Sequence, residues 1–175
     1  MVQNLKQLDK SAFEGEGKCM VLRHKELEAE SGHEAGRKLL AEMYRQVTGQ
    51  ELPPIVKGPH GKPCFPEGDW HFSITHTKRH VFCALSDRPI GIDAEETDRK
   101  IHLDLAEKIL SPNEKKRYDA APDKPAALLK LWVLKEAAAK CTGEGIYGYP
   151  NKTDFSPDDP RIQIIHGCYL AIVEE

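Results

Sequence analysis

The chain has 175 residues, 30% of them charged, and a formal net charge of only −3. This balance gives no electrostatic reason to expect nucleic-acid binding, and the longest apolar runs are far too short to span a bilayer. The five cysteines are scattered without a Cys-x-x-Cys pair, and the N-terminus lacks the apolar region of a signal peptide. We therefore expect a cytoplasmic protein with free thiols and no membrane contact.

The hydrophobic pattern predicts the same layout twice along the chain. Each half reads as a helix, then a loop rich in Pro and Gly, then two β-like runs. The segments are 34–47, 50–68, 70–74 and 81–86 in the first half, and 125–140, 143–160, 161–165 and 169–173 in the second. No residues match between the halves, so the duplication rests on layout alone. We expect an α+β fold, as one domain or as two small lobes that share a core.

Residues Ile90 to Glu95 form a short apolar stretch that carries two carboxylates. An extended strand alternates its faces, so Asp93 and Glu95 lie on the side of Gly91, opposite the isoleucines. Two buried carboxylates repel each other unless they share a cation, and the glycine leaves room for something to approach the backbone. The alternative is an exposed strand edge that runs into the polar turn over 95–98.

A later helical segment carries charges at the end of a face that begins with Leu129 and Trp132. These two residues, Glu136 and Lys140 recur at spacings of three and four, so they form one stripe. The local alternative is an ordinary Glu–Lys pair four residues apart, which stabilises a helix by roughly 0.2–0.5 kcal/mol. Lys135 points about 100° away from Glu136 and is expected to be solvated or to play a supporting part.

Three carboxylates from these two segments offer hard oxygen ligands: Asp93, Glu95 and Glu136. Magnesium is typically held by one or two carboxylates plus waters and substrate phosphates. Together with the nearby ammonium of Lys140, the three carboxylates suggest a substrate that is a magnesium-bound phosphate.

Five motifs stand in a fixed order along the chain. They are Gly61-Lys62-Pro63, Phe72-Ser-Ile-Thr-His-Thr77, Ile90-Gly-Ile-Asp-Ala-Glu95, Ser111-Pro-Asn-Glu114 and Trp132-Val-Leu-Lys-Glu-Ala-Ala-Ala-Lys140. In order and spacing they resemble the signature of the 4'-phosphopantetheinyl transferase superfamily. The first two are similar to the Gly-Lys-Pro and Phe-Asn-x-Ser-His-Ser motifs of its larger, Sfp-type branch. The resemblance covers about residues 37–148 and marks the chain as a short Sfp-type member.

The resemblance implies a two-lobed fold. Residues 1–89 would form an N-terminal lobe with the coenzyme A phosphate-binding residues, and residues 90–175 a C-terminal lobe with the magnesium site. Each lobe would pack a helix on a small antiparallel sheet. A pseudo-twofold axis would relate the lobes, and the active site would lie in the cleft of one compact unit. A monomer is expected, in contrast to the trimeric, single-lobe holo-acyl-carrier-protein synthase branch.

The reaction that the resemblance implies is phosphopantetheine transfer. A serine of an apo acyl or peptidyl carrier protein would attack coenzyme A, and 3',5'-adenosine bisphosphate would leave. Coenzyme A is then a cosubstrate, and Mg²⁺ is the cofactor. Two other functions need similar residues: a magnesium-dependent nucleotide phosphohydrolase, and a non-catalytic protein that binds coenzyme A or a carrier.

The resemblance also implies roles for individual residues. It implies that Asp93, Glu95 and Glu136 bind magnesium. It also implies that Asp93, Glu136, Lys140 and Glu114 are the catalytic residues. It further implies that cationic and hydroxyl-bearing side chains bind the phosphates of coenzyme A: Arg37, Lys62, Thr75, His76, Thr77 and Lys140. Tyr147 and Tyr149 either line the pantetheine groove or belong to an ordinary Gly-rich loop.

Glu114 has two interpretations. Ser111 can cap a helix that begins at Pro112, and Ser-x-x-Glu is the signature of a capping box, which accounts for both residues without catalysis. The family resemblance instead places Glu114 near the metal, where it would ligate magnesium or take the proton from the incoming serine.

Overall fold

The computed structural model describes residues 20–145 and 153–175. It shows a mixed α+β architecture with antiparallel sheets, so the expected fold class is confirmed. The elements in chain order are β1 (Met20–Glu26), α1 (Gly32–Thr48), β2 (Val56–Lys57), β3 (Pro63–Cys64), β4 (His71–His76), β5 (His80–Ser86), β6 (Ile90–Glu96), η2 (Leu103–Leu105), α2 (Ala106–Ile109), α3 (Pro112–Ala120), α4 (Lys124–Thr142), β7 (Ile162–Ile165) and β8 (Cys168–Glu174).

Two three-stranded sheets form the centre of the molecule. The first sheet has the order β1-β5-β4 and the second the order β6-β8-β7, and β2 pairs with β3 in a separate two-stranded ribbon. All pairings are antiparallel. In each three-stranded sheet the central strand is the last of the three in the chain, so the repeated layout of the sequence becomes a repeated sheet order.

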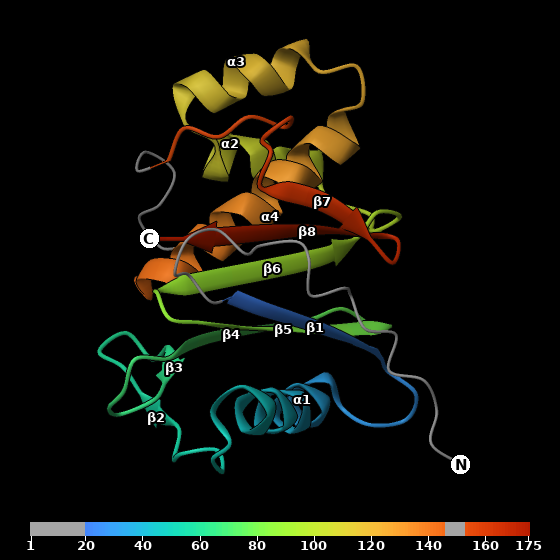
Figure 1. Ribbon diagram of the computed structural model, residues 1–175. Helices are drawn as coiled ribbons and strands as arrows, with labels where there is room; N and C mark the ends of the chain where they lie inside the picture. Colours follow the sequence, from blue (N-terminus) through green and yellow to red (C-terminus); the bar gives the residue numbers. More distant parts are fainter. Residues whose placement is uncertain (1–19, 146–152) are drawn as a thin grey trace.

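The sheets pack face to face and each carries a helix on its outer face. Figure 1 shows the resulting succession from α1 through the first and second sheets to α4. On the first sheet, alternate residues Val81, Cys83 and Leu85 of β5 pack against α1. The intervening Phe82 and Ala84 enter a core shared with the second sheet. The strand period of two therefore builds both cores from one strand.

The two long helices have clear start and stop signals. Ser31 caps α1 by accepting a hydrogen bond from the backbone N–H of Glu34, and Asp123 caps α4 in the same way. Gly49 ends α1 and Gly143 ends α4, both in the left-handed conformation, with φ of 72° and 78°.

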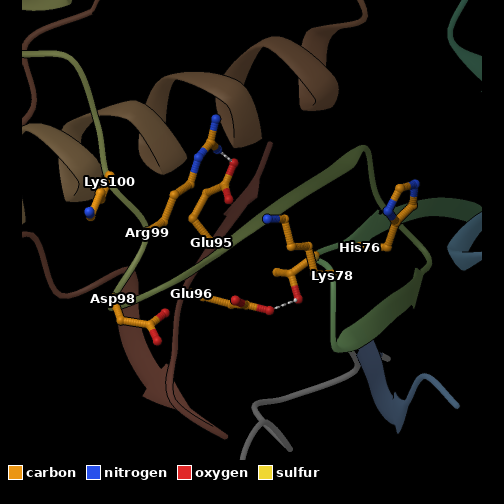
Figure 2. Close-up of a pocket in the computed structure, with 8 residues that line it drawn as sticks. His76, Lys78, Glu95, Glu96, Asp98, Arg99 and Lys100 are labelled. Atoms are coloured by element: carbon orange, nitrogen blue, oxygen red, sulfur yellow. Dashed lines mark hydrogen bonds and ion pairs between the residues drawn. The ribbon is translucent and has the colours of Figure 1, made fainter.

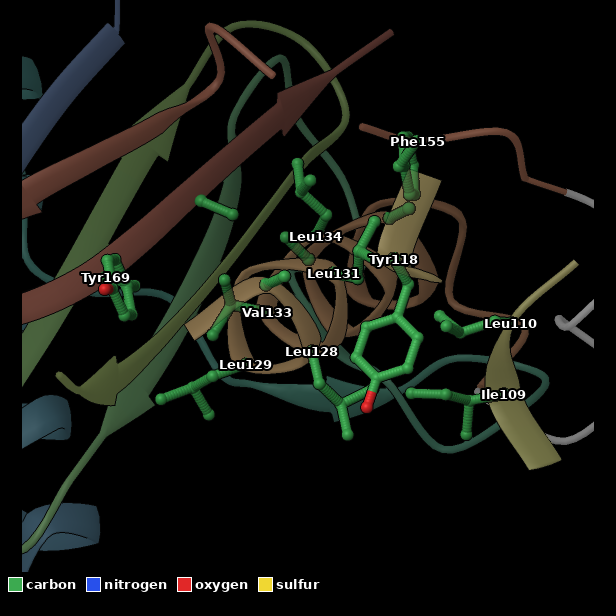
Figure 3. Close-up of a cluster of buried hydrophobic side chains, with 14 of the residues drawn as sticks. Ile109, Leu110, Tyr118, Leu128, Leu129, Leu131, Val133, Leu134, Phe155 and Tyr169 are labelled. Carbon is green, nitrogen blue, oxygen red and sulfur yellow. The ribbon is translucent and has the colours of Figure 1, made fainter. Parts of the chain in front are cut away.

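Helix α4 is enclosed on most of its surface. Leu128, Leu131 and Leu134 pack into one cluster with Tyr118 of α3 and Phe155, as Figure 3 shows. On the predicted stripe, Leu129 is buried and Trp132, Glu136 and Lys140 are half-buried, so the two charges lie at the rim of the core. The other sides of the helix are covered by α2, α3 and the segment that precedes β7.

The predicted helices and strands match the structure to within two residues at each end. The strand β1 was not predicted. It is a sheet edge whose side chains are all partly or fully exposed, so it lacks the apolar alternation that marks a strand. In the part of the chain that the structure describes, no helix has the length and apolar character needed to cross a membrane.

Candidate active site at the junction of β4, β6 and α4

Strand β6 lies between the first sheet and α4. Ile90 and Ile92 belong to the core between the two sheets, together with Phe82. On the opposite face, Gly91 meets the backbone of α4: a Cβ on this glycine would lie 2.0 Å from the carbonyl oxygen of Ala137. The predicted alternation of faces is therefore confirmed, and the group that approaches the glycine is the helix itself.

Asp93 is the next residue on this face, and it pairs with α4. Lys140 Nζ lies 2.6 Å from Asp93 Oδ1, and the side chain of Asp93 is almost fully buried. Burial and the negative charge of Asp93 raise the pKa of Glu136, while Lys140 and Arg99 oppose that shift. Asp93, Glu136 and Lys140 therefore form one electrostatically coupled group where β6 crosses α4.

Glu95 lies at the outer end of the same face. It is ion-paired with Arg99, four residues later, and its side chain is partly buried. Since Arg99 also acts on the pKa of Glu136, this pair borders the Asp93 group. The structure thus places all three predicted magnesium ligands in one region, each with a cationic neighbour.

Whether these residues fit a magnesium ion can be judged from their charges. Within residues 20–145 and 153–175, no three His, Cys, Asp or Glu side chains are gathered closely enough to hold a metal ion. However, the two donors that bind Asp93, Thr75 and Lys140, both contact Oδ1. The negative charge of Asp93 also destabilises the ionised form of Glu136. A divalent cation relieves that repulsion, and magnesium needs only one or two carboxylates beside a phosphate. The charges of Asp93 and Glu136 are thus compatible with a divalent cation, and the three-residue ligand set stays a prediction.

The three residues predicted at the end of β4 have three different environments. Thr75 Oγ1 donates a hydrogen bond to Asp93 Oδ1 at 2.9 Å. Thr77 Oγ1 donates to a carboxylate at the end of β6 at 3.0 Å. His76 is exposed, and its ring packs over Gly32 at the start of α1, where a Cβ would lie 2.5 Å from the ring. The exposed imidazole therefore lies against the N-terminus of α1.

A pocket of about 770 Å³ opens between the turn after β4 and the end of β6 (Figure 2). His76 lies on one side of the pocket. The charged lining residues are the acidic Glu95, Glu96 and Asp98 and the basic Lys78, Arg99 and Lys100. Close carboxylates and cations in one open pocket suit a phosphate ester that arrives with a divalent cation.

The sequence analysis did not single out the three basic residues of this pocket. Arg99 follows Glu95 by four residues, but that spacing indicates a contact only within a helix, and here the chain has left a strand. Lys78 and Lys100 come from two different connections that only the folded chain brings together. No pattern in the sequence marks them as neighbours.

Arg37 and Lys62 are absent from the lining of this pocket. Arg37 is half-buried on α1, and its side chain makes no hydrogen bond to another described residue. Lys62 Nζ donates to the backbone carbonyls of Cys141 at 2.8 Å and Ile90 at 3.2 Å, and burial lowers its pKa. Their predicted contacts with coenzyme A stay predictions. Tyr147 and Tyr149 lie outside the described residues.

Glu114 lies in a fully buried network. Its Oε2 accepts from the backbone N–H of Ser111 at 2.8 Å, which completes a capping box, and pairs with Lys135 Nζ at 2.8 Å. Its Oε1 accepts from Thr153 Oγ1 at 3.1 Å and from the N–H of Phe155 at 3.0 Å. Both side chains of the ion pair are at most 2% exposed, so the solvated alternative for Lys135 is wrong. The capping role of Glu114 is present, and its catalytic role stays a prediction.

Comparison with known proteins finds a family match in the second half of the chain. Residues 89–170 match the family model of the 4'-phosphopantetheinyl transferase superfamily. The 4'-phosphopantetheinyl transferase Sfp of Bacillus subtilis is 40% identical over 91 residues, which are 50% of this chain and 40% of the relative. The 4'-phosphopantetheinyl transferase psf-1 of Bacillus pumilus is 37% identical over 121 residues, 67% of this chain and 51% of the relative. The gsp protein of Aneurinibacillus migulanus, a 4'-phosphopantetheinyl transferase, is 36% identical over 93 residues, 52% of this chain and 38% of the relative.

The segment that matches the superfamily model contains β6, α4, β7 and the first three residues of β8, and with them every predicted metal ligand. Thr75 and His76 come before this segment, and Thr75 contacts it in space through its hydrogen bond to Asp93. The matches to these relatives cover about half of their length or less, from 38% to 51%.

Proposed function

We propose that this protein is a 4'-phosphopantetheinyl transferase that moves the phosphopantetheine arm of coenzyme A to a serine of an apo acyl or peptidyl carrier protein. The observation that carries the proposal is the Asp93–Lys140–Glu136 group, which lies within the segment that matches the superfamily model. The group is coupled electrostatically to Arg99, which lines a pocket of mixed charge. The relatives that match are themselves 4'-phosphopantetheinyl transferases, which supports the same reaction here.

In this proposal the protein binds and orients two substrates rather than forming a covalent intermediate. The serine hydroxyl attacks the β-phosphate of coenzyme A and gives up its proton, for which Glu114 is the proposed acceptor. The phosphoanhydride bond breaks, and 3',5'-adenosine bisphosphate leaves. Lys140, His76 and Lys78 supply positive charge and hydrogen bonds to the phosphates as charge moves to the leaving group. Arg37, Lys62 and Thr77 are proposed to hold the remainder of coenzyme A. When bound, Mg²⁺ at Asp93, Glu95 and Glu136 would neutralise the pyrophosphate.

We further propose that residues 1–89 and 90–175 act as two lobes of one compact unit with the site between them. The repeated sheet order and the contact of Thr75 with Asp93 support this division. The protein would then act as a monomer in the cytoplasm, with one active site per chain. Sedimentation velocity tests the monomer, and a stable trimer would contradict it.

The proposed reaction is tested by incubating the protein with coenzyme A, Mg²⁺ and an apo carrier protein, and then measuring the intact mass of the carrier. A gain of one phosphopantetheine group on the carrier supports transfer. The matched control is the same carrier with its acceptor serine replaced by alanine, which should gain nothing.

The same reaction mixture separates the two other functions. Release of adenosine bisphosphate without labelling of the carrier would indicate a phosphohydrolase. Binding of coenzyme A without either product would indicate a non-catalytic binding protein. Either result contradicts the proposed transferase.

A further inference from the structure

Strands β4 and β6 lie side by side but belong to different sheets. The two strands are not paired by backbone hydrogen bonds. Instead, hydroxyl side chains of β4 and of Thr77 just after it form hydrogen bonds across the seam between the two sheets. Each bridge joins residues 19 apart in the chain: Ser73 Oγ to the N–H of Ile92 at 3.0 Å, Thr75 Oγ1 to the N–H of Ala94 at 3.3 Å, and Thr77 Oγ1 to Glu96 Oε1 at 3.0 Å. The hydroxyls of Ser73 and Thr75 satisfy N–H groups of β6 that would otherwise be buried without a partner. Thr77, which directly follows β4, donates to a side-chain carboxylate instead.

Thr75 differs from the other two because its hydroxyl also contacts Asp93. Its hydroxyl accepts from the N–H of Ala94 and donates to Asp93 Oδ1 at 2.9 Å. The threonine is 5% exposed and the aspartate 6%, so water has little access to replace this bond. The β-branched side chain has few rotamers, which fixes the direction of the hydroxyl.

We infer that Thr75 is a positioning residue that fixes the carboxylate of Asp93 from across the seam. Lys140 Nζ binds the same oxygen, Oδ1, from the opposite element at 2.6 Å. Two donors from β4 and α4 thus hold Oδ1, and no described residue donates to Oδ2. The second oxygen is left for a cation or a phosphate-bound water. The functional side of this inference rests on the proposed transferase.

This role differs from the expected contact between Thr75 and the pyrophosphate. A hydroxyl that touches coenzyme A contributes to its binding, so its loss raises KM for coenzyme A. A hydroxyl that acts through Asp93 leaves that KM nearly unchanged and lowers kcat and the affinity for the divalent ion. Orientation of this kind typically changes metal affinity or activity by about 10–100-fold.

The test compares Thr75→Val with Ser73→Ala. Valine keeps the shape of threonine but removes the hydroxyl. Ser73→Ala removes another hydroxyl of the seam, and Ser73 makes no contact with Asp93. Thr75→Ser is the rescue variant, since it restores the donor. For each protein we would measure kcat and KM for coenzyme A, thermal unfolding, and binding of Mn²⁺ by electron paramagnetic resonance without coenzyme A.

We expect Thr75→Val to lose about 10-fold or more in kcat and in Mn²⁺ affinity. Ser73→Ala should change neither value, and Thr75→Ser should recover both. Equal effects of Thr75→Val and Ser73→Ala would overturn the inference, as would a raised KM for coenzyme A with kcat and Mn²⁺ affinity intact. If Thr75→Val does not fold, Thr75→Ala replaces it.

The Mn²⁺ measurement separates this inference from the proposed function. If the wild-type protein labels no carrier, the transferase proposal fails, and the relative Mn²⁺ affinities of the variants still decide the role of Thr75. If the wild-type protein binds no Mn²⁺, the positioning role is overturned even where transfer is observed.

Discussion

The ammonium of Lys62 lies 2.8 Å from the backbone carbonyl of Cys141, 79 residues later in the chain. Cys141 is in the last turn of α4, where helix carbonyls have no intrahelical partner and carry the negative end of the macrodipole. The same ammonium also donates to the carbonyl of Ile90, at the start of β6. The lysine of the Gly-Lys-Pro motif thus ties the first half of the chain to the two elements that carry the candidate site.

Lys62→Met should lower the free energy of unfolding by about 1.5–3 kcal/mol, because two buried carbonyls lose a charged donor. Chemical denaturation measures this. Lys78→Met is the matched control, since Lys78 is exposed, and it should change stability little. If Lys62 also contacts coenzyme A, KM for coenzyme A rises in the folded variant. An unchanged KM would leave Lys62 with the structural role alone.

Asp93→Asn should abolish phosphopantetheine transfer while the protein stays folded. Asparagine keeps the shape and can still accept from Thr75, but it removes the charge that pairs with Lys140. We expect turnover to fall by about 100-fold or more. The mass of the carrier protein over time gives the rate, and circular dichroism checks the fold. Activity within about tenfold of wild type at saturating Mg²⁺ would refute the assignment of Asp93 to the metal site.

Glu114→Gln separates the helix-cap role from the general-base role. Breaking one side of the buried pair with Lys135 should cost about 3–5 kcal/mol, so the melting temperature should fall. The double variant Glu114→Gln/Lys135→Met removes both charges and should recover most of that stability.

Turnover of the double variant then decides the role of Glu114. Near-normal turnover would leave the glutamate as a structural residue. A loss of about 100-fold or more in a protein with restored stability is what the loss of a general base gives.

Gly91→Ala should destabilise the protein strongly. The new Cβ would lie 2.0 Å from the carbonyl oxygen of Ala137 and 2.3 Å from the backbone nitrogen of Cys141, so β6 and α4 would have to move apart. Overpacking typically costs about 1–3 kcal/mol, and a clash with backbone lies at the upper end or beyond. Gly58→Ala is the control, since its nearest atom would lie at 3.4 Å. Equal melting temperatures for the two variants would contradict the close approach.

Stability should fall as the pH drops from about 6.5 towards about 4, because His24 resists protonation in the folded state. Its ring stacks on His166 with centroids 3.9 Å apart and lies 3.0 Å from a nitrogen of His80. Burial, with the charges of His166 and His80, lowers the pKa of His24 from 6.5 to about 4. The unfolded chain therefore takes up the proton first, and the contribution is fully present above pH 6.5.

Denaturation at pH 7.5 and pH 5 tests this dependence on pH. His24→Asn should flatten the difference between the two pH values, whereas the exposed His60→Asn should not. The charges of Glu26, Glu96 and Arg79 influence the pKa of the neighbouring His80. Neither variant changes these three residues. The same pH slope in wild type and His24→Asn would assign the effect to other groups.

The sequence by itself determined the local parts of this protein. Alternation in Ile90–Glu95 predicted which face carries Asp93, and helical spacing predicted α1 and α4. The Ser111–Glu114 spacing predicted a capping box, which is present. These features depend on residues a few positions apart, so periodicity and capping chemistry are sufficient to identify them.

Only the tertiary structure decided the partners of the charged and hydroxyl groups. The hydrogen bond from Thr75 to Asp93 and the burial of Lys135 against Glu114 join different elements. The same holds for the contact between Lys140 and Asp93, which are 47 residues apart. A lysine on a helix carries no local sign of whether it is solvated or buried, because its environment depends on which elements pack around that helix. In this protein those environments are set by the close packing of β6 on α4 at Gly91 and by α2 and α3, which cover α4.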